Sequence, residues 1–168
     1  MAKQARKAKK TMLASRARRK LPARRRAAPP KPAAKPRKKR QMLKQTFVAS
    51  HHSPDAFEVG LRRYAQYRDL GIAAATGGLA RAHVIKMVPP CDPAEVSKRH
   101  YHEVEFQMVY VLKGWIKSEF EGAGVVTMRE GSCWLQPPKI KHTVLDYSDD
   151  CELLEIILPA DFETVELA

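Results

Sequence analysis

Short apolar runs, separated by turn-forming residues, make up most of the chain from Thr46 onward. Side chains two apart in a β-strand point to the same side, so each run can be divided into two faces. In FQMVYVL, at residues 106–112, Gln107, Val109 and Val111 fall on one face and the intervening side chains on the other. The breaks between runs contain Gly, Pro or Asp-Asp, which favour turns. The pattern therefore predicts an all-β domain.

The predicted strands have ordinary lengths and are joined by tight turns. The sequence ATGG at residues 75–78 predicts a turn, and the Pro-Pro pair at 89–90 ends a strand because proline cannot donate to a β-ladder. Residues 53–63 are expected to be irregular or partly helical. The expected strands cover residues 46–49, 64–70, 79–88, 106–112, 115–121, 124–130, 132–136, 142–147 and 151–158. Short strands connected in this way are typical of a sandwich, a barrel or a jelly roll.

The first 44 residues differ from the rest of the chain in composition. They consist almost entirely of Ala, Lys, Arg and Pro, and they hold 19 of the 31 Lys and Arg residues and none of the 18 Asp and Glu residues. The net charge of +13 therefore resides in this segment, and residues 45–168 carry a net charge of −6. With few large apolar side chains to bury, residues 1–44 cannot offset their ordering entropy. We predict a disordered basic tail at residues 1–44, followed by a folded domain at residues 45–168.

Three roles for this tail stay open. It can bind nucleic acid or another polyanion by releasing counterions, in which case binding weakens steeply with salt. It can be a solvated segment without a function of its own. It can also be an organellar transit peptide, although its Lys and Pro content and its scarcity of Ser argue against that role.

The cysteine pattern and the hydropathy favour a cytoplasmic protein. Cys91, Cys133 and Cys151 are odd in number and lack CxxC spacing, which predicts reduced thiols and neither a disulfide framework nor a zinc ribbon. The sequence has no run of about 18 apolar residues, and its N-terminus lacks the apolar region of a secretory signal. We therefore expect a cytoplasmic location and no membrane span.

A histidine pair near the middle of the chain has a metal-binding pattern. His100 and His102 are two apart in an expected strand, so their imidazoles point to one side and can hold one ion between them. Gln107, if it faces inward, lies at the start of the next strand beside this pair. A second constellation lies at residues 131–142, where a glycine gives a turn, a proline ends a strand and His142 opens the next strand.

The first stretch resembles the first motif of the cupin superfamily. In outline this motif reads Gly, five residues, His-x-His, three or four residues, Glu, six residues, Gly. Here His100-x-His102, four residues, Gln107, six residues and Gly114 keep every spacing. Ala94 occupies the position of the leading glycine, and Gln107 occupies the position of the glutamate.

The second stretch resembles the second cupin motif, which reads Gly, five residues, Pro-x-Gly, two residues, His, three residues, Asn. Gly131, Pro137 and His142 keep the spacing of this motif. Lys139 replaces its second glycine and Asp146 replaces its asparagine. Because two independent spacings agree along one chain, the resemblance is specific for the fold.

The resemblance implies a single cupin domain, a small double-stranded β-helix or jelly-roll barrel whose conserved core spans about residues 79–160. It also implies that a divalent transition metal, Fe, Mn, Ni, Cu or Zn, is held by His100, His102, Gln107 and His142. Glutamine can coordinate through its carbonyl oxygen, but it removes one negative charge from the site. The ion should then be bound more weakly and act as a stronger Lewis acid. A degenerate barrel that binds no metal is the alternative.

Further candidate site residues lie in or beside the same predicted strands. Trp134 and Gln136 are two apart in one strand and can both face a ligand pocket, for which Trp115 is a third candidate. The candidate general acids or bases are Glu103, Glu105, Tyr110 and Asp146. Ordinary surface or strand roles are expected for the histidines outside the motif spacings, which are His51, His52 and His83.

Two functions of different kinds follow from these features. One is a metal-dependent enzyme that acts on a small polar molecule by oxygen activation, isomerisation or hydrolysis, with the ion as Lewis acid. The other is a non-catalytic ligand-binding or sensor barrel whose basic tail binds nucleic acid or another polyanion. The sequence does not decide between them. In both cases we expect a homodimer, since symmetric dimers are the commonest oligomers.

Overall fold

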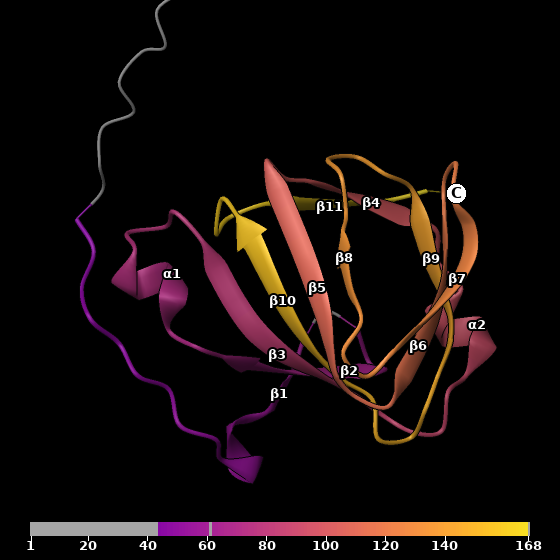
Figure 1. Ribbon diagram of the computed structural model, residues 1–168, viewed down its shortest axis with the longest axis horizontal. Helices are drawn as coiled ribbons and strands as arrows, with labels where there is room; N and C mark the ends of the chain where they lie inside the picture. Colours follow the sequence, from indigo (N-terminus) through magenta and orange to yellow (C-terminus); the bar gives the residue numbers. More distant parts are fainter. Residues whose placement is uncertain (1–43, 61, 168) are drawn as a thin grey trace, which may run out of the picture. The chain divides into compact units, whose positions relative to one another are not determined.

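The computed structural model describes residues 44–60 and 62–167, which build two antiparallel sheets (Figure 1). The described residues all belong to one compact unit. The predicted basic tail lies outside the described residues apart from Lys44, so its disorder stays a prediction.

Eleven strands form the two sheets among the described residues. The first sheet has the strand order β1-β2-β3-β10-β5-β8, and the second has the order β11-β4-β9-β6-β7. The strands of the first sheet are β1 (Glu58–Val59), β2 (Ala65–Asp69), β3 (Arg81–Met87), β5 (Phe106–Lys113), β8 (Cys133–Leu135) and β10 (Glu152–Leu158). The strands of the second sheet are β4 (His100–Glu103), β6 (Trp115–Phe120), β7 (Gly124–Arg129), β9 (His142–Tyr147) and β11 (Glu163–Glu166).

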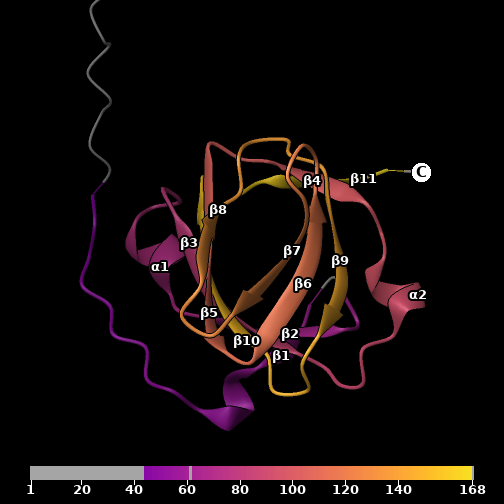
Figure 2. The same ribbon diagram turned by 45° about the vertical axis from the view of Figure 1, so that its right-hand side comes forward.

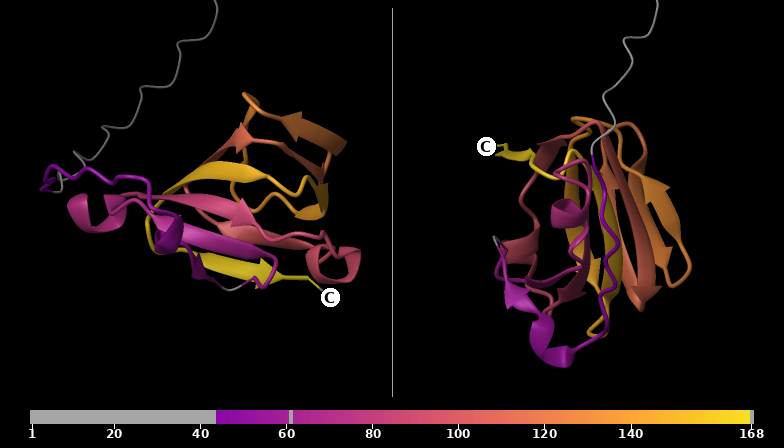
Figure 3. Two further views of the ribbon diagram at one scale, coloured as in Figure 1. Left: turned by 90° about the horizontal axis from the view of Figure 1, so that it is seen from below. Right: turned by 90° about the vertical axis from the view of Figure 1, so that its left-hand side faces the viewer.

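Short helical segments connect some of the strands: η1 (Pro54–Ala56), α1 (Ile72–Ala75) and α2 (Pro93–Val96). Figures 2 and 3 show the two sheets curving toward each other as the walls of a barrel, with α1 outside the first sheet near β3 and α2 outside the second sheet near β9. None of the described helices has the length and hydropathy needed to cross a membrane.

Apolar side chains on the inner faces hold the two sheets together. Val109 and Val111 of β5 belong to the same buried cluster as Ile116 and Phe120 of β6 and Leu153 of β10. Burying one such side chain contributes about 1.5–3 kcal/mol to folding. The alternation predicted for FQMVYVL is confirmed, because Gln107, Val109 and Val111 are the buried residues of β5.

The all-β jelly-roll prediction is confirmed, and most predicted strands lie within a few residues of their expected positions. The strand expected at residues 46–49 is wrong: this segment has no regular secondary structure and joins no sheet, although Thr46 N donates to Ala75 O at 2.8 Å. Strand β11 was not predicted from the sequence, because its four residues are too few and too polar to show an apolar alternation.

Two turns explain the glycine positions of the cupin motifs. Gly114 joins β5 to β6 with φ 68°, and a Cβ atom there would lie 2.1 Å from Ser148 Oγ. Lys139, before β9, has φ 62°, a left-handed conformation that costs a non-glycine residue roughly 1–2 kcal/mol. Its Nζ lies 2.8 Å from Glu103 Oε1. Lys139 therefore stands at a motif glycine position and keeps the conformation that glycine favours.

Candidate metal centre

Three histidines meet on the inner surface of the second sheet. His100 and His102 belong to β4, His142 begins β9, and His100 pairs directly with His142 across the β4–β9 ladder. One nitrogen from each ring lies within 4.8 Å of the corresponding nitrogens of the other two. His100 and His142 are each only 6% exposed. The structure therefore brings together the three histidines that the two sequence motifs single out.

Backbone carbonyls orient two of these rings. His100 Nδ1 lies 2.8 Å from Lys98 O, and His142 Nδ1 lies 3.0 Å from Ile140 O. A carbonyl oxygen only accepts hydrogen bonds, so each Nδ1 carries the proton and each Nε2 keeps its lone pair. This is the tautomer that a metal ligand requires.

The third ring is oriented by β11. His102 Nδ1 lies 2.9 Å from the hydroxyl of Thr164, which pairs with His102 in the β4–β11 ladder. A hydroxyl can accept the Nδ1 proton in the same way as a carbonyl, which leaves Nε2 of His102 available. Thr164 was not identified from the sequence, because the strand that carries it was not predicted.

Burial keeps the three imidazoles neutral. It lowers the pKa of His102 to about 4 and that of His142 to about 3, and it also lowers the pKa of His100. Neighbouring histidines lower the pKa of His102 and His142 further, because a second proton in the cluster would place two like charges together. Neutral imidazole is the form that binds metal, so the cluster is ready for an ion at neutral pH.

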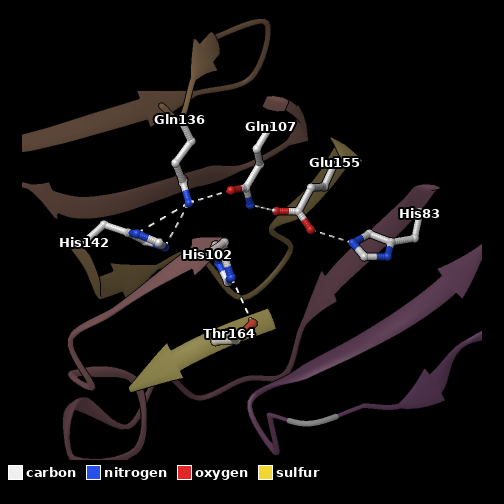
Figure 4. Close-up of polar contacts among 7 residues, drawn as sticks. All are labelled: His83, His102, Gln107, Gln136, His142, Glu155 and Thr164. Carbon is white, nitrogen blue, oxygen red and sulfur yellow. Dashed lines mark hydrogen bonds and ion pairs between the residues drawn. The ribbon is translucent and has the colours of Figure 1, made fainter. Parts of the chain in front are cut away.

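Gln107 and Gln136 lie beside the histidines and are linked to each other (Figure 4). Gln136 Nε2 donates to Gln107 Oε1 at 3.1 Å and lies 3.0 Å from His142 Nε2. Trp134 Nε1, which can only donate, lies 3.3 Å from Gln136 Oε1 and so fixes which way the Gln136 amide points. In this arrangement the Gln136 amide occupies the lone pair that His142 would offer to a metal.

A buried carboxylate lies on the other side of Gln107. Gln107 Nε2 donates to Glu155 Oε1 at 2.6 Å, and Glu155 Oε2 lies 2.6 Å from His83 Nε2 (Figure 4). The Glu155 side chain is 13% exposed. Hydrogen bonds thus run without a break from His83 through Glu155, Gln107 and Gln136 to His142.

Glu155 is ionised in this position. Burial alone would raise the pKa of Glu155, but its hydrogen bond and electrostatic interaction with His83 and the hydrogen bond from Gln107 together hold this pKa below its ordinary value. The negative charge that Gln107 lacks is therefore present on the neighbouring strand, β10.

Glu155 and His83 were not identified as site residues from the sequence. For His83 an ordinary strand role was expected, and the structure instead places it in the cavity that contains the histidine cluster. One signal was available for Glu155: it is an acidic residue in the middle of the apolar run CELLEIIL, at a position that falls on the inner face of a barrel strand.

The histidines open into a cavity of about 820 Å³ inside the barrel. Its polar lining includes all three histidines, Gln107 and Gln136, and Trp134 contributes to the wall. Much of the remaining wall is apolar, as is usual for small-molecule sites. The apolar lining residues include Ile85, Met87, Val109, Ile116, Phe120, Val144 and Leu153.

Five other predicted site residues do not line this cavity. Glu103, at the end of β4, is exposed and pairs with Lys139. Tyr110 and Trp115 alternate to the outer faces of β5 and β6, opposite the buried residues of those strands. Glu105 is exposed in the turn between β4 and β5. Asp146 also points outward, because a β-bulge at Leu145 shifts the register of β9 against β6 and reverses the alternation.

The donor set fits a divalent transition metal. The ligand nitrogens of three neutral imidazoles converge within 4.8 Å of one another. For an ion to bind at about 2.1 Å, His142 must release the Gln136 amide and the three nitrogens must move closer together. Imidazole suits Zn, Cu, Fe and Ni, whereas Mg and Ca prefer oxygen ligands. The cluster is therefore a candidate site for a divalent transition metal.

An antiparallel double-sheet barrel with a histidine cluster on its inner surface is a jelly-roll protein with an internal metal or ligand site. A family profile described as a cupin domain matches residues 91–157, a range that contains all three histidines and Gln107. Residues 91–157 therefore match a cupin domain, which confirms the interpretation of the two sequence motifs.

Solved structures share this fold at low sequence identity. The polyketide cyclase RemF from Streptomyces resistomycificus is similar with a TM-score of 0.58 and 15% identity, over 73% of this chain and 87% of that chain. KdgF from Halomonas sp. has a TM-score of 0.52 and 20% identity, over 66% of this chain and 94% of that chain. Oxalate decarboxylase from Bacillus subtilis has a TM-score of 0.53 and 15% identity, over 74% of this chain and 34% of that chain. No curated protein sequence matches this chain significantly.

Proposed function

We propose that the protein is a metal-dependent cupin enzyme that acts on a small organic molecule inside its barrel. The observation that carries this proposal is the convergence of three neutral imidazoles, from His100, His102 and His142, in one cavity. The metal that we propose for this site is Fe, Mn, Ni, Cu or Zn. Structures with the same fold include proteins named polyketide cyclase, oxalate decarboxylase and salicylate 1,2-dioxygenase, and all three names describe chemistry on small organic molecules.

Gln107 is the proposed fourth ligand, through its carbonyl oxygen. Oε1 of Gln107 accepts one hydrogen bond from Gln136 and has a second lone pair for an ion. His142 Nε2 must exchange its contact with the Gln136 amide for the ion. The bound metal would supply Lewis-acid activation of a substrate oxygen.

Glu155 is the group that we propose to exchange a proton with the substrate. It lines the cavity, it is ionised, and His83 and Gln107 hold its two oxygens in place. His83 Nε2 lies 2.6 Å from Glu155 Oε2, within the distance over which a proton can pass between the two groups. The acids and bases predicted from the sequence, Tyr110 and Asp146 among them, have no comparable position in the cavity.

Metal analysis of protein prepared without a polyhistidine tag tests the metal centre. Wild-type protein, reconstituted and passed over a chelating resin, should retain one divalent ion per chain, and His142→Ala should bind at least about 100-fold more weakly. The control is the His51→Ala/His52→Ala variant, which removes the exposed histidine pair outside the cavity and should retain the ion. A wild type without metal, or a control that loses it, would contradict the proposal.

We further propose that residues 1–44 bind nucleic acid or another polyanion, whether the barrel is catalytic or a ligand-binding sensor. The support is the uneven distribution of charge along the chain, because this segment has 19 basic residues and no acidic residue. Each neutralised DNA phosphate contributes about −0.9 to the slope of log affinity against log salt. Deleting residues 1–44 should remove both DNA binding and its salt dependence. Equal binding by the truncated and intact proteins would exclude this role.

We also propose that residues 45–168 form one folded domain that dimerises in the cytoplasm. The support for dimerisation is an apolar outer surface on the first sheet, formed by Phe106, Tyr110 and Leu112 of β5 and Leu135 of β8. Leu135 is the most exposed of them, at 60%. Apolar surface of this kind in a soluble protein commonly marks an interaction site.

A further inference from the structure

Arg62 lies just before β2 and lines the same cavity as the three histidines. Its side chain is only 11% exposed, and its Nη1 donates to a carboxylate oxygen of Glu166 on β11. Glu166 pairs directly with His100 in the β11–β4 ladder, so side chains at these two positions share one face of the sheet. The ion pair therefore holds the guanidinium on the side of the cavity that carries the histidine cluster.

The other terminal nitrogen of Arg62, Nη2, is buried and has no hydrogen-bond partner among the described residues. Leaving a buried donor unpaired costs about 1–3 kcal/mol, and more when the group is charged. Buried polar groups in folded proteins are normally satisfied by protein, water, an ion or a ligand. A guanidinium presents its donors in a planar fork that matches a carboxylate. The unpaired donor therefore favours an anionic, carboxylate-bearing ligand.

The other charges around the cavity are compatible with an anion. Arg81, at the start of β3, also lines the cavity, and its guanidinium lies 6.0 Å from the centre of the Phe162 ring. Phe162 contacts His102 edge to face, so this second cation is also near the histidine cluster. Of the three acidic lining residues, Asp69 and Glu155 already accept hydrogen bonds from within the protein, and Glu58 is exposed.

The remaining wall indicates what the rest of the ligand looks like. The cavity volume of about 820 Å³ lies within the range of pockets that hold small-molecule ligands. Its apolar wall would leave a wholly polar ligand with unsatisfied groups, whereas an apolar or aromatic body would gain from burial there. Members of this wall include Met87, Phe120, Trp134 and Leu153.

We propose that the substrate is a small organic acid with an apolar or aromatic body, and that Arg62 binds its carboxylate beside the metal centre. This inference rests on the proposed function, because it names the substrate class of the same cavity. Arg62 holds the carboxylate, and the apolar wall holds the body of the molecule next to the histidines. Loss of the guanidinium should therefore weaken the binding of acids and leave the binding of the metal intact.

Binding of benzoate, with benzamide as its neutral analogue, tests this inference. Affinities are measured by calorimetry and by tryptophan fluorescence, to which Trp134 in the cavity wall contributes, on zinc-loaded and on metal-free protein. Bound zinc is counted in each sample. Wild-type protein should bind benzoate at least about tenfold more tightly than benzamide, and Arg62→Gln should remove this difference. Arg62→Lys, which keeps the charge and loses the fork, should bind benzoate with intermediate affinity.

Two controls separate recognition from folding. Arg63→Gln removes the exposed neighbouring arginine and should bind benzoate like the wild type. Glu166→Gln removes the charge of the Arg62 partner but keeps the guanidinium and a side-chain oxygen that can accept its hydrogen bond, so it should also retain benzoate binding. Loss of binding in Glu166→Gln to the same extent as in Arg62→Gln would assign Arg62 a structural role and overturn the inference.

The experiment can contradict the carboxylate-binding role of Arg62 and the proposed metal centre independently of each other. Equal affinities for benzoate and benzamide in the wild type, no saturable benzoate binding, or Arg62→Gln binding like the wild type would overturn the carboxylate assignment, even if zinc is bound. Arg62-dependent benzoate binding by a protein that binds no zinc would support the assignment and contradict the proposed metal centre.

Discussion

At the scale of single residues, Gln107 occupies the glutamate position of the first cupin motif, and the buried carboxylate beside it belongs to Glu155 on the neighbouring strand. The pair is joined by a 2.6 Å hydrogen bond from the amide to the carboxylate. A carboxylate at position 107 would instead meet Glu155 as a like charge. The two residues are therefore matched to each other, and the negative charge of the site lies one strand away from the proposed ligand position.

Exchanging these two side chains tests the match. Gln107→Glu alone should destabilise the protein, because one of two adjacent carboxylates must take up a proton. The double variant Gln107→Glu/Glu155→Gln restores the hydrogen bond and places a carboxylate at the ligand position. We expect it to bind a divalent metal at least about tenfold more tightly than the wild type in competition with a chelating dye. Glu155→Gln alone serves as the control and should show no gain, and a double variant no tighter than the wild type would refute this account.

The buried histidines should make the stability of the metal-free protein depend on pH. Their pKa falls from 6.5 to about 4 for His102 and to about 3 for His142 on folding. Between these values the unfolded chain binds more protons than the folded chain, so the free energy of unfolding decreases as the pH falls from about 6.5 to about 4. Urea denaturation of metal-free protein should show this decrease. His142→Gln should have a shallower dependence, and a wild-type stability that is flat over this range would contradict the burial of neutral histidines.

At the scale of elements, the turn before β9 carries a strain that a single substitution can remove. Lys139 has φ 62°, and glycine adopts this conformation at little cost. The contact of Lys139 with Glu103 is exposed, so losing it costs little. We expect Lys139→Gly to raise the free energy of unfolding by up to about 1 kcal/mol. Lys139→Ala is the control, because it removes the same ion contact without relieving the strain, and it should be no more stable than the wild type.

Most of the strands and the three clustered histidines could be predicted because they depend on local sequence. Alternation in FQMVYVL and the two motif spacings were sufficient to find the inner face of β5 and the three histidines. The orientation of Asp146 was not predictable, since it depends on a bulge created by pairing with β6. Glu155 and His83 come together only through the β3–β10 ladder, in which they pair directly although they are 72 residues apart.

At the scale of the whole molecule, the apolar outer surface of β5 and β8 is the proposed dimer interface. If two copies pair through this surface, a charge on Leu135 should disrupt the dimer while leaving the inner cavity unchanged, because Leu135 points away from it. We expect wild-type residues 45–168 to elute as a dimer in size-exclusion chromatography with light scattering, and Leu135→Lys to shift toward monomer. Val125→Lys, on the exposed face of β7, is the control. A Leu135→Lys protein as dimeric as the wild type would exclude this surface.

The central claim is that one transition metal is bound by the histidine cluster inside the barrel. Anomalous diffraction at the absorption edge of the metal, from crystals of reconstituted protein, tests it most directly. We expect one strong peak per chain, about 2.0–2.3 Å from Nε2 of His100, His102 and His142. The Gln136 amide should have moved away from His142 in the same map. Metal-containing crystals without a peak at these three nitrogens would contradict the account.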